Sequence, residues 1–256
     1  MTEWSFIIHN EFNKGGILMR LGGMGNGQPN GMNSMGNGQA PMNNGMNPMG
    51  GQAPMNNGMN PMGTQAPTGV INLVKGQKID LTKGNPSLNK VTIGLGWDVA
   101  DIPGVEFDLD ASVFMVDNTG RTEQSGFIFY NNLRGPGVEH MGDNRTGAGD
   151  GDDEQVQITF SEVPANIEKI AITVTIYDYE NRRQNFGMVN NAFCRVVDAS
   201  TDRELIRYNL SENFSVETAM VICELYRHNG EWKFSAVGSG FTGGLHALCR
   251  NYGLPV

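Results

Sequence analysis

The chain has 256 residues, with 18 Lys and Arg against 27 Asp and Glu, so its formal net charge is −9. An acidic chain repels phosphate backbones, which argues against nucleic-acid binding, and no apolar run reaches the ~20 residues that a transmembrane helix needs. The three cysteines (Cys194, Cys223 and Cys249) are widely spaced. This spacing favours neither a disulfide framework nor a zinc site, and it fits a reducing compartment such as the cytoplasm.

Residues 1–21 form a segment of their own, with a short apolar run from Trp4 to Ile8. It lacks the basic start and the long apolar stretch of a secretory signal. Two interpretations are open. The segment is a short apolar N-terminal anchor, or translation starts at Met19, because Lys14-Gly15-Gly16 can be encoded by a purine-rich ribosome-binding sequence at a suitable distance.

Residues 22–67 have low complexity. Residues 22–63 hold 12 Gly, 10 Asn, 9 Met and 5 Pro and no charged residue, and the unit QAPMNNGMNPMG at 39–50 recurs unchanged at 52–63. The unit has no periodic apolar face, and Gly and Pro oppose both helix and sheet, so the entropy of ordering is not recovered. We therefore predict a disordered linker. Its methionines are soft ligands for an ion such as Cu(I), although repeat expansion with Met tolerated is the simpler explanation.

Residues 68–256 predict a single all-β domain, an antiparallel β-sandwich. Short segments rich in Val, Ile, Phe and Thr alternate with Gly, Asn, Asp and Pro, which is the spacing of such folds. Asn229-Gly230 predicts a hairpin turn, and apolar residues at helical spacing predict one short C-terminal helix over 245–252. The predicted strands are 70–73, 90–95, 107–116, 126–130, 156–160, 170–177, 192–197, 204–208, 218–226 and 232–237.

The acidic excess lies in residues 98–154, which hold 13 acidic and three basic residues. In a strand over 107–112, Phe107, Leu109 and Ala111 would face the core. Asp108, Asp110 and Ser112 would then share the other face, with like charges about 7 Å apart. The segment 142–154 adds five acidic residues, one Asn and four Gly. Carboxylate, amide and backbone oxygens together are the ligands that Ca²⁺ prefers.

We therefore predict a calcium site at these acidic segments, with Asn131 and Asp178 added because each follows a predicted strand. Zinc is disfavoured, since His is scarce and the cysteines lie elsewhere. The spacing is not that of an EF-hand, because Val113 or Gln155 would occupy its invariant glycine position. Mg²⁺, and solvated turns without metal, remain open alternatives. The candidate ligands are Asp98, Asp108, Asp110, Asn131, Asp143, Asn144, Gly149, Asp150, Asp152, Glu154 and Asp178.

Several of these motifs resemble the TerD family of tellurium-resistance and stress-response proteins over residues 68–256. The matching segments are Gly94-Leu95-Gly96-Trp97-Asp98, Phe107-Asp108-Leu109-Asp110-Ala111-Ser112, Phe129-Tyr130-Asn131-Asn132, Gly142 to Glu154, Gln184 to Gly187, Glu217 to Met220 and Glu224 to Lys233. The resemblance implies a cytoplasmic β-sandwich that binds two Ca²⁺ ions through the acidic loops. It also implies complexes with other stress and tellurium-resistance proteins at the inner membrane surface. The repeat-containing N-terminal segment departs from the family.

Two further functions compete with a calcium-dependent binding or scaffold module that is not an enzyme. A metal-assisted hydrolase would need a base, and His140 is the one candidate near the acidic loop. No nucleophile elbow, His-Glu-x-x-His motif or P-loop is present. Direct capture of oxyanions by thiols would need accessible cysteines, whereas the apolar context of all three predicts buried, structural thiols.

Overall fold

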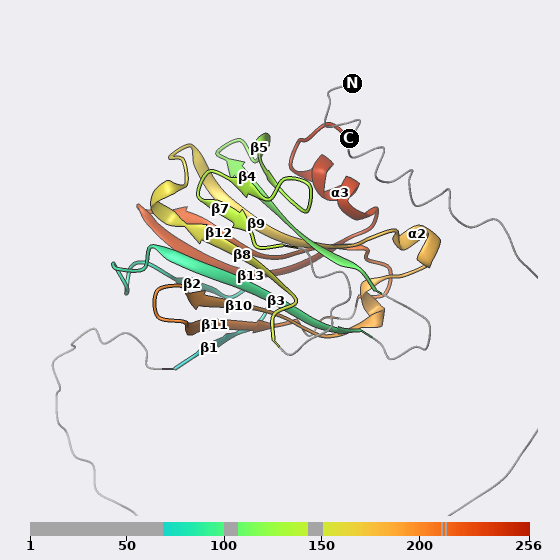
Figure 1. Cartoon of the computed structure of the whole chain (residues 1–256), viewed down its shortest axis with the longest axis horizontal. Helices are drawn as coiled ribbons and strands as arrows, with labels where there is room; N and C mark the ends of the chain where they lie inside the picture. The colour runs from blue at the N-terminus through green and yellow to red at the C-terminus, as the bar shows by residue number, and fades with distance from the viewer. Residues whose placement is uncertain (1–68, 100–106, 143–150, 211, 213) are drawn as a thin grey trace, which may run out of the picture. The chain divides into compact units, whose positions relative to one another are not determined.

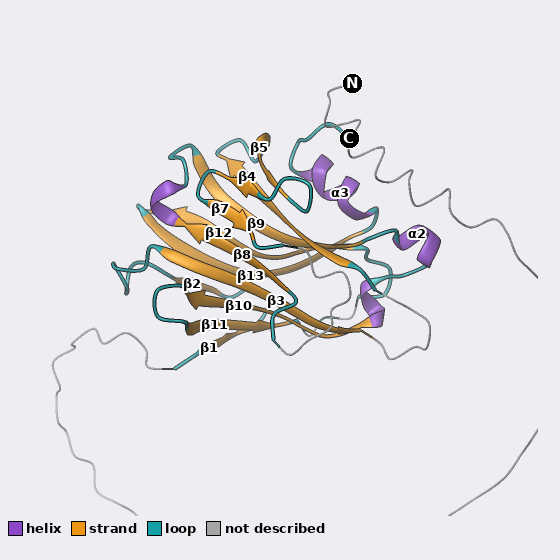
Figure 2. Ribbon diagram, in the orientation of Figure 1, coloured by secondary structure: helices purple, strands orange, loops and turns teal. Residues whose placement is uncertain are grey.

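The computed structural model describes residues 69–99, 107–142, 151–210, 212 and 214–256. The expectations for 1–67, including the linker, the start at Met19 and soft-metal binding, lie outside these residues. The described chain forms two sheets that face each other (Figures 1 and 2). The prediction of an all-β sandwich with one short C-terminal helix is confirmed.

Sheet A has seven strands. In spatial order they are β1 (Ile71–Leu73), β11 (Arg203–Asn209), β10 (Val189–Asp198), β3 (Lys90–Val99), β8 (Glu154–Thr159), β7 (Val138–His140) and β6 (Arg134–Gly135). All neighbouring pairs are antiparallel except β1 with β11, which is parallel.

Sheet B has six antiparallel strands. Their order is β2 (Lys78–Asp80), β13 (Glu231–Phe241), β12 (Ala219–His228), β9 (Ile167–Ile176), β4 (Leu109–Asp117) and β5 (Thr122–Ile128). Helix α3 (Gly244–Asn251) lies over the outer face of this sheet (Figure 1). None of the helices in the described part of the chain is long and apolar enough to cross a membrane.

Strict alternation along β4 divides the buried apolar side chains between two cores. Leu109, Ala111 and Val113 belong to the core between the sheets, whereas Phe114 belongs to the second core, beneath α3. Neighbouring residues of a strand point to opposite faces, so one strand can serve both cores. The polar residues Asp110 and Ser112 are therefore on the outer face of sheet B, as the pattern predicted.

Local turn chemistry also agrees with the sequence. Asn229 and Gly230 have φ of 54° and 81° and join β12 to β13. Two successive positive φ values are what a type I′ hairpin turn requires, and Asn and Gly adopt them at little cost.

The observed secondary structure differs from the predicted one in its short elements. The sequence did not indicate β2, β6, β7 or the one-turn helix α2 (Tyr179–Arg182), each of two to four residues. Elements of this length contain no more than one or two repeats of an apolar pattern, which is too few for periodicity to reveal them.

Candidate functional site

Two buried carboxylates lie at the start of β4. Asp108 immediately precedes the strand, Asp110 lies within it, and each residue is 7% exposed. Asp110 pairs in register with Thr175 of β9, and Ser112 pairs with Thr173. All four of these neighbours are buried, so polar oxygen atoms line this part of the outer face of sheet B.

The hydroxyl oxygen of Ser112 belongs to this row. The buried Ser112 Oγ makes no hydrogen bond to any described residue. Thr173 Oγ1, in contrast, donates to the Ser112 carbonyl oxygen at 3.0 Å. A buried hydroxyl without a partner among the described residues is uncommon, and such groups often bind an ion or a water.

The topology brings two more candidates to the same end of sheet B. Asp178 lies just beyond β9, where the Tyr177 N–H donates to the Asp108 carbonyl oxygen at 2.8 Å. Asn131 is exposed in the turn that follows β5, the strand beside β4. Asp178 has a φ of 52°, and its carboxylate accepts a hydrogen bond from Asn181 Nδ2 at 2.6 Å.

Glu154 links the two sheets near these residues. It begins β8 in sheet A and pairs with the core residue Leu95. Its Oε2 accepts a hydrogen bond from the Ala111 N–H of sheet B at 2.7 Å, and it lies 3.3 Å from His140 Nε2. The described pairing of β5 with β4 ends at Val113. The Ala111 N–H lies beyond this last pair, and Glu154 is its hydrogen-bond acceptor.

His140 is buried and held on both sides. Its side chain is 1% exposed, and its Nδ1 accepts a hydrogen bond from the Gly142 N–H at 3.2 Å. Because Nδ1 accepts a hydrogen bond it carries no proton, so Nε2, which lies close to Glu154, is the nitrogen that can carry one. A buried ring with contacts at both nitrogens has no access to a substrate proton, which does not favour His140 as a general base.

Asp152 lies on the opposite, outer face of sheet A. Its carboxylate accepts two hydrogen bonds from Arg195 of β10, Nε to Oδ1 at 2.6 Å and Nη2 to Oδ2 at 2.9 Å. These bonds raise the pKa of the Arg195 guanidinium. The carboxylate occupies space over Gly94, where any side chain would overlap it.

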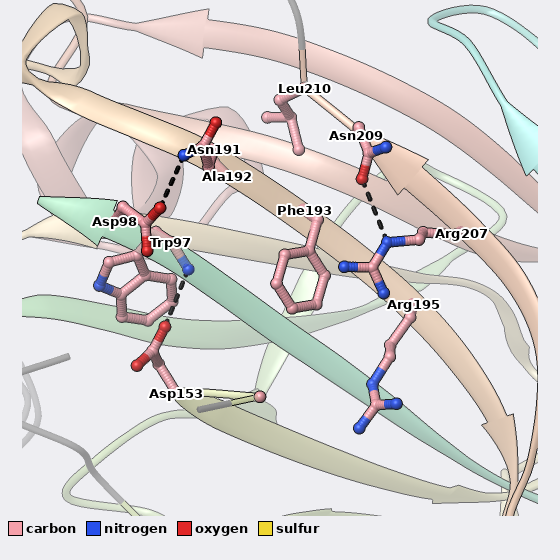
Figure 3. A pocket seen from close by; sticks show the side chains of 11 residues that line it. Trp97, Asp98, Asp153, Asn191, Ala192, Phe193, Arg195, Arg207, Asn209 and Leu210 are labelled. Carbon is pink, nitrogen blue, oxygen red and sulfur yellow. Dashed lines mark hydrogen bonds between the residues drawn. The ribbon is translucent and has the colours of Figure 1, made fainter. Parts of the chain in front are cut away.

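A pocket of about 560 Å³ opens on the same outer face (Figure 3). Asp98 and Asp153 line one end: Asp98 accepts from Asn191 Nδ2 at 2.6 Å, and Asp153 accepts from the Trp97 N–H at 2.8 Å. Burial raises the pKa of Asp153, and the nearby charges of Asp98 and Asp152 raise it further. The remaining lining residues are Gly151, Ala192, Phe193, Arg195, Arg207, Asn209 and Leu210.

The described candidate ligands therefore form two groups. Asp108, Asp110 and Asp178 lie at one end of sheet B with Asn131 and Glu154 nearby, whereas Asp98 and Asp152 lie on the outer face of sheet A. Among the described residues no three His, Cys, Asp or Glu side chains are grouped to hold a metal ion. Asp143, Asn144, Gly149 and Asp150 lie outside the described residues, in the segment that connects Gly142 to Gly151.

Sequence reasoning missed Arg195 and the pocket around Phe193. No local pattern pairs Arg195 with Asp152, because 43 residues separate them. The signal that was available is the pair of glycines in Gly94-Leu95-Gly96, since a strand glycine often marks a close approach of another group. Here the groups are the Asp152 carboxylate over Gly94 and the Phe193 ring over Gly96.

The comparisons with known proteins agree with this architecture. The TerD domain matches residues 70–252. General stress protein 16U of Bacillus subtilis (strain 168) is 58% identical over 190 residues, covering 73% of this chain and 98% of that protein. Tellurium resistance protein TerD of Serratia marcescens is 50% identical over 187 residues, covering 72% of this chain and 97% of that protein.

A solved structure shows the same fold. The crystal structure of a homologue of telluride resistance protein TerD from Streptomyces coelicolor A3(2) matches with a TM-score of 0.53. The match covers 66% of this chain and 100% of that chain, at 21% identity, so it supports the fold alone. The domain match and the two relatives show that this chain is a member of the TerD family.

Proposed function

We propose that the chain is a stress-response protein that contributes to tellurite and chemical-stress resistance as a calcium-dependent binding or scaffold module. The names of its relatives support the resistance role: one is a general stress protein, one a tellurium resistance protein, and a third, from Clostridium acetobutylicum, a chemical-damaging agent resistance protein. The partners would be other stress and tellurium-resistance proteins, at the inner face of the membrane in the cytoplasm.

The observation that supports calcium is the buried oxygen row on sheet B. Asp108 and Asp110 place two carboxylates on one face of β4, next to the Ser112 hydroxyl, which lacks a partner among the described residues. Carboxylate and hydroxyl oxygens are hard ligands, which suit Ca²⁺ and Mg²⁺ and not Zn²⁺ or Cu⁺. Asp108, Asp110 and Asp178 would supply carboxylates, and Glu154 would hold β4 against sheet A.

A binding module fits this arrangement better than a hydrolase does. Ca²⁺ orders acidic loops and can bridge partners through shared oxygen ligands. Hydrolysis would need a general base beside the metal, and the buried ring of His140 does not reach a substrate. Direct thiol capture has equally little support, because all three cysteines are buried.

Calorimetric titration of the full chain, first freed of metal with a chelator, tests this proposal. We expect Ca²⁺ to bind more tightly than Mg²⁺, and the Asp108→Asn/Asp110→Asn variant to lose at least tenfold in affinity. Glu123→Gln/Asp202→Asn removes the same charge from two exposed positions and should bind as the wild type does. An intact protein that binds no Ca²⁺, or equal losses in both variants, would refute a specific calcium site.

The scaffold role is tested separately in cells. Expression of the wild-type chain should raise tellurite tolerance, and Asp108→Asn/Asp110→Asn should remove that gain at equal protein level. A triple variant with serine at Cys194, Cys223 and Cys249 should retain the gain if it folds. Lost tolerance in a folded triple variant would favour thiol capture instead.

A further inference from the structure

The pocket on the outer face of sheet A carries charges of both signs at separate positions. Its floor is built by three neighbouring strands in register: Gly96 of β3 pairs with Phe193 of β10, which pairs with Asn209 of β11. Two residues further along these strands, Arg195 pairs with Arg207. In Figure 3 the two aspartates lie to one side of the Phe193 ring and the two arginines to the other.

Three groups are stacked at the centre of the pocket. Phe193 lies over Gly96, where no side chain could fit beneath it, and the Arg207 guanidinium lies 4.0 Å from the centre of the ring. A cation over an aromatic face is attracted by the electrons of the ring. Backbone, ring and guanidinium thus form a stack that holds Arg207 in place.

Arg207 is available to an anion, whereas Arg195 is not. Arg195 is engaged by both carboxylate oxygens of Asp152. Among the described residues Arg207 makes only long hydrogen bonds, Nε to Asn209 Oδ1 at 3.3 Å and Nη1 to Glu204 Oε1 at 3.4 Å, and its Nη2 bonds to none of them. Its side chain is 32% exposed. A planar guanidinium with a free edge is suited to a carboxylate or phosphate.

The opposite end of the pocket attracts a cation. Asp98 and Asp153 both line it, and two carboxylates at the same end of a pocket repel each other. A positively charged group placed between them would relieve that repulsion. The side-chain amides of Asn191 and Asn209 also line the pocket, and each offers hydrogen-bond donors and an acceptor.

The strand geometry sets the distance between the two ends. Arg207 lies over the ring that covers Gly96, and Asp98 follows Gly96 by two residues on the same strand. Residues two apart on a strand are separated by about 7 Å, so we expect a ligand that contacts both Asp98 and Arg207 to carry its two charges about 7 Å apart. A single α-amino acid is too short, whereas an extended di- or tripeptide, at about 3.5 Å per residue, spans this distance.

We infer that this pocket binds a zwitterionic peptide segment, with its ammonium group at Asp98 and Asp153, its carboxylate at Arg207 and its amide groups between. The pocket is larger than a di- or tripeptide, so it can also hold neighbouring residues of a longer peptide ligand. Nucleotides and polyphosphates fit less well, because their negative charge would extend to the two aspartates. The inference does not rest on calcium binding.

Titration of the full chain with triglycine, in the presence of chelator, tests the inference. N-acetyl-triglycine lacks the cation and triglycine amide lacks the anion, so each should bind at least fivefold more weakly than triglycine. Asp153→Asn should abolish the preference for triglycine over its acetylated form, and Arg207→Gln should abolish the preference over the amide. Arg134→Gln, at an exposed position outside the pocket, should preserve both preferences.

Two additional arms complete the experiment. The blocked peptide acetyl-Lys-Gly-Glu-amide carries its charges on side chains, and its binding would identify an internal segment, not a chain terminus, as the source of the ligand. The inference fails if neither peptide binds, or if the variants keep both preferences. It also fails if inorganic phosphate binds as well as triglycine and more tightly in Asp153→Asn, which would define an anion site.

Discussion

Asp152 and Glu154 are two residues apart in the sequence, yet their carboxylates lie on opposite faces of sheet A. Asp152 lies outside, in a two-bond pair with Arg195, whereas Glu154 faces the core with Leu95 and accepts from the Ala111 N–H of sheet B. Residues two apart share a face only within a regular strand, and β8 begins at Glu154. The acidic run that looks continuous in the sequence therefore has two different structural roles.

The pair of Asp152 and Arg195 should contribute substantially to stability. The Asp152 side chain is 2% exposed, so removing Arg195 leaves a buried charge with the neutral Gln155 amide as a donor and no opposite charge in contact. We expect Arg195→Met to lower the free energy of unfolding by about 3 kcal/mol, measured by urea denaturation in chelator. The matched change Arg134→Met breaks a surface pair whose arginine is 80% exposed, and should cost less than about 1 kcal/mol. Equal losses would show that the buried pair has no special role.

We expect the stability of the chain to depend on the small size of Gly96. A methyl group there would overlap the Phe193 ring, so Gly96→Ala should destabilise the chain by about 1–3 kcal/mol. It should also weaken triglycine binding, because the ring supports Arg207. Gly84 has open space around it and no positive φ, so Gly84→Ala should change stability by less than about 0.5 kcal/mol. Thermal unfolding of both variants measures the difference. A neutral Gly96→Ala would mean that the ring moves aside freely.

The sequence predicts those features of the fold and the site that depend on residues close together in the chain, and not those that depend on distant residues. The alternation of Leu109 and Ala111 with Asp108 and Asp110 is local, so it predicted the strand and its two faces correctly. Partners such as Ala111 and Glu154, 43 residues apart on different sheets, depend on how the sheets meet. No local pattern carries that information. For the same reason the pocket around Phe193, built from three strands, was not predicted at all.

Buried thiols should make the protein sensitive to alkaline pH. Burial raises the pKa of Cys249 to about 12 and that of Cys223 well above its ordinary 9.0. Between pH 8 and 10 the unfolded chain therefore loses thiol protons that the folded chain retains, and stability falls as pH rises. Each thiol should cost about 1.4 kcal/mol over this window. Urea denaturation at pH 8 and pH 10 should show that Cys249→Ala recovers about that amount; an unchanged pH dependence would contradict burial of the thiol.

Two substitutions of Glu154 can separate its structural role from a role in metal binding. Glu154→Gln retains an oxygen that can accept from the Ala111 N–H, whereas Glu154→Ala leaves this buried donor without its acceptor. In chelator we expect the glutamine variant to stay within about 1 kcal/mol of the wild type, and the alanine variant to lose about 1–3 kcal/mol. If Glu154 also binds Ca²⁺, the glutamine variant should lose calcium affinity while it keeps its stability. An alanine variant as stable as the wild type would remove Glu154 as the link between the sheets.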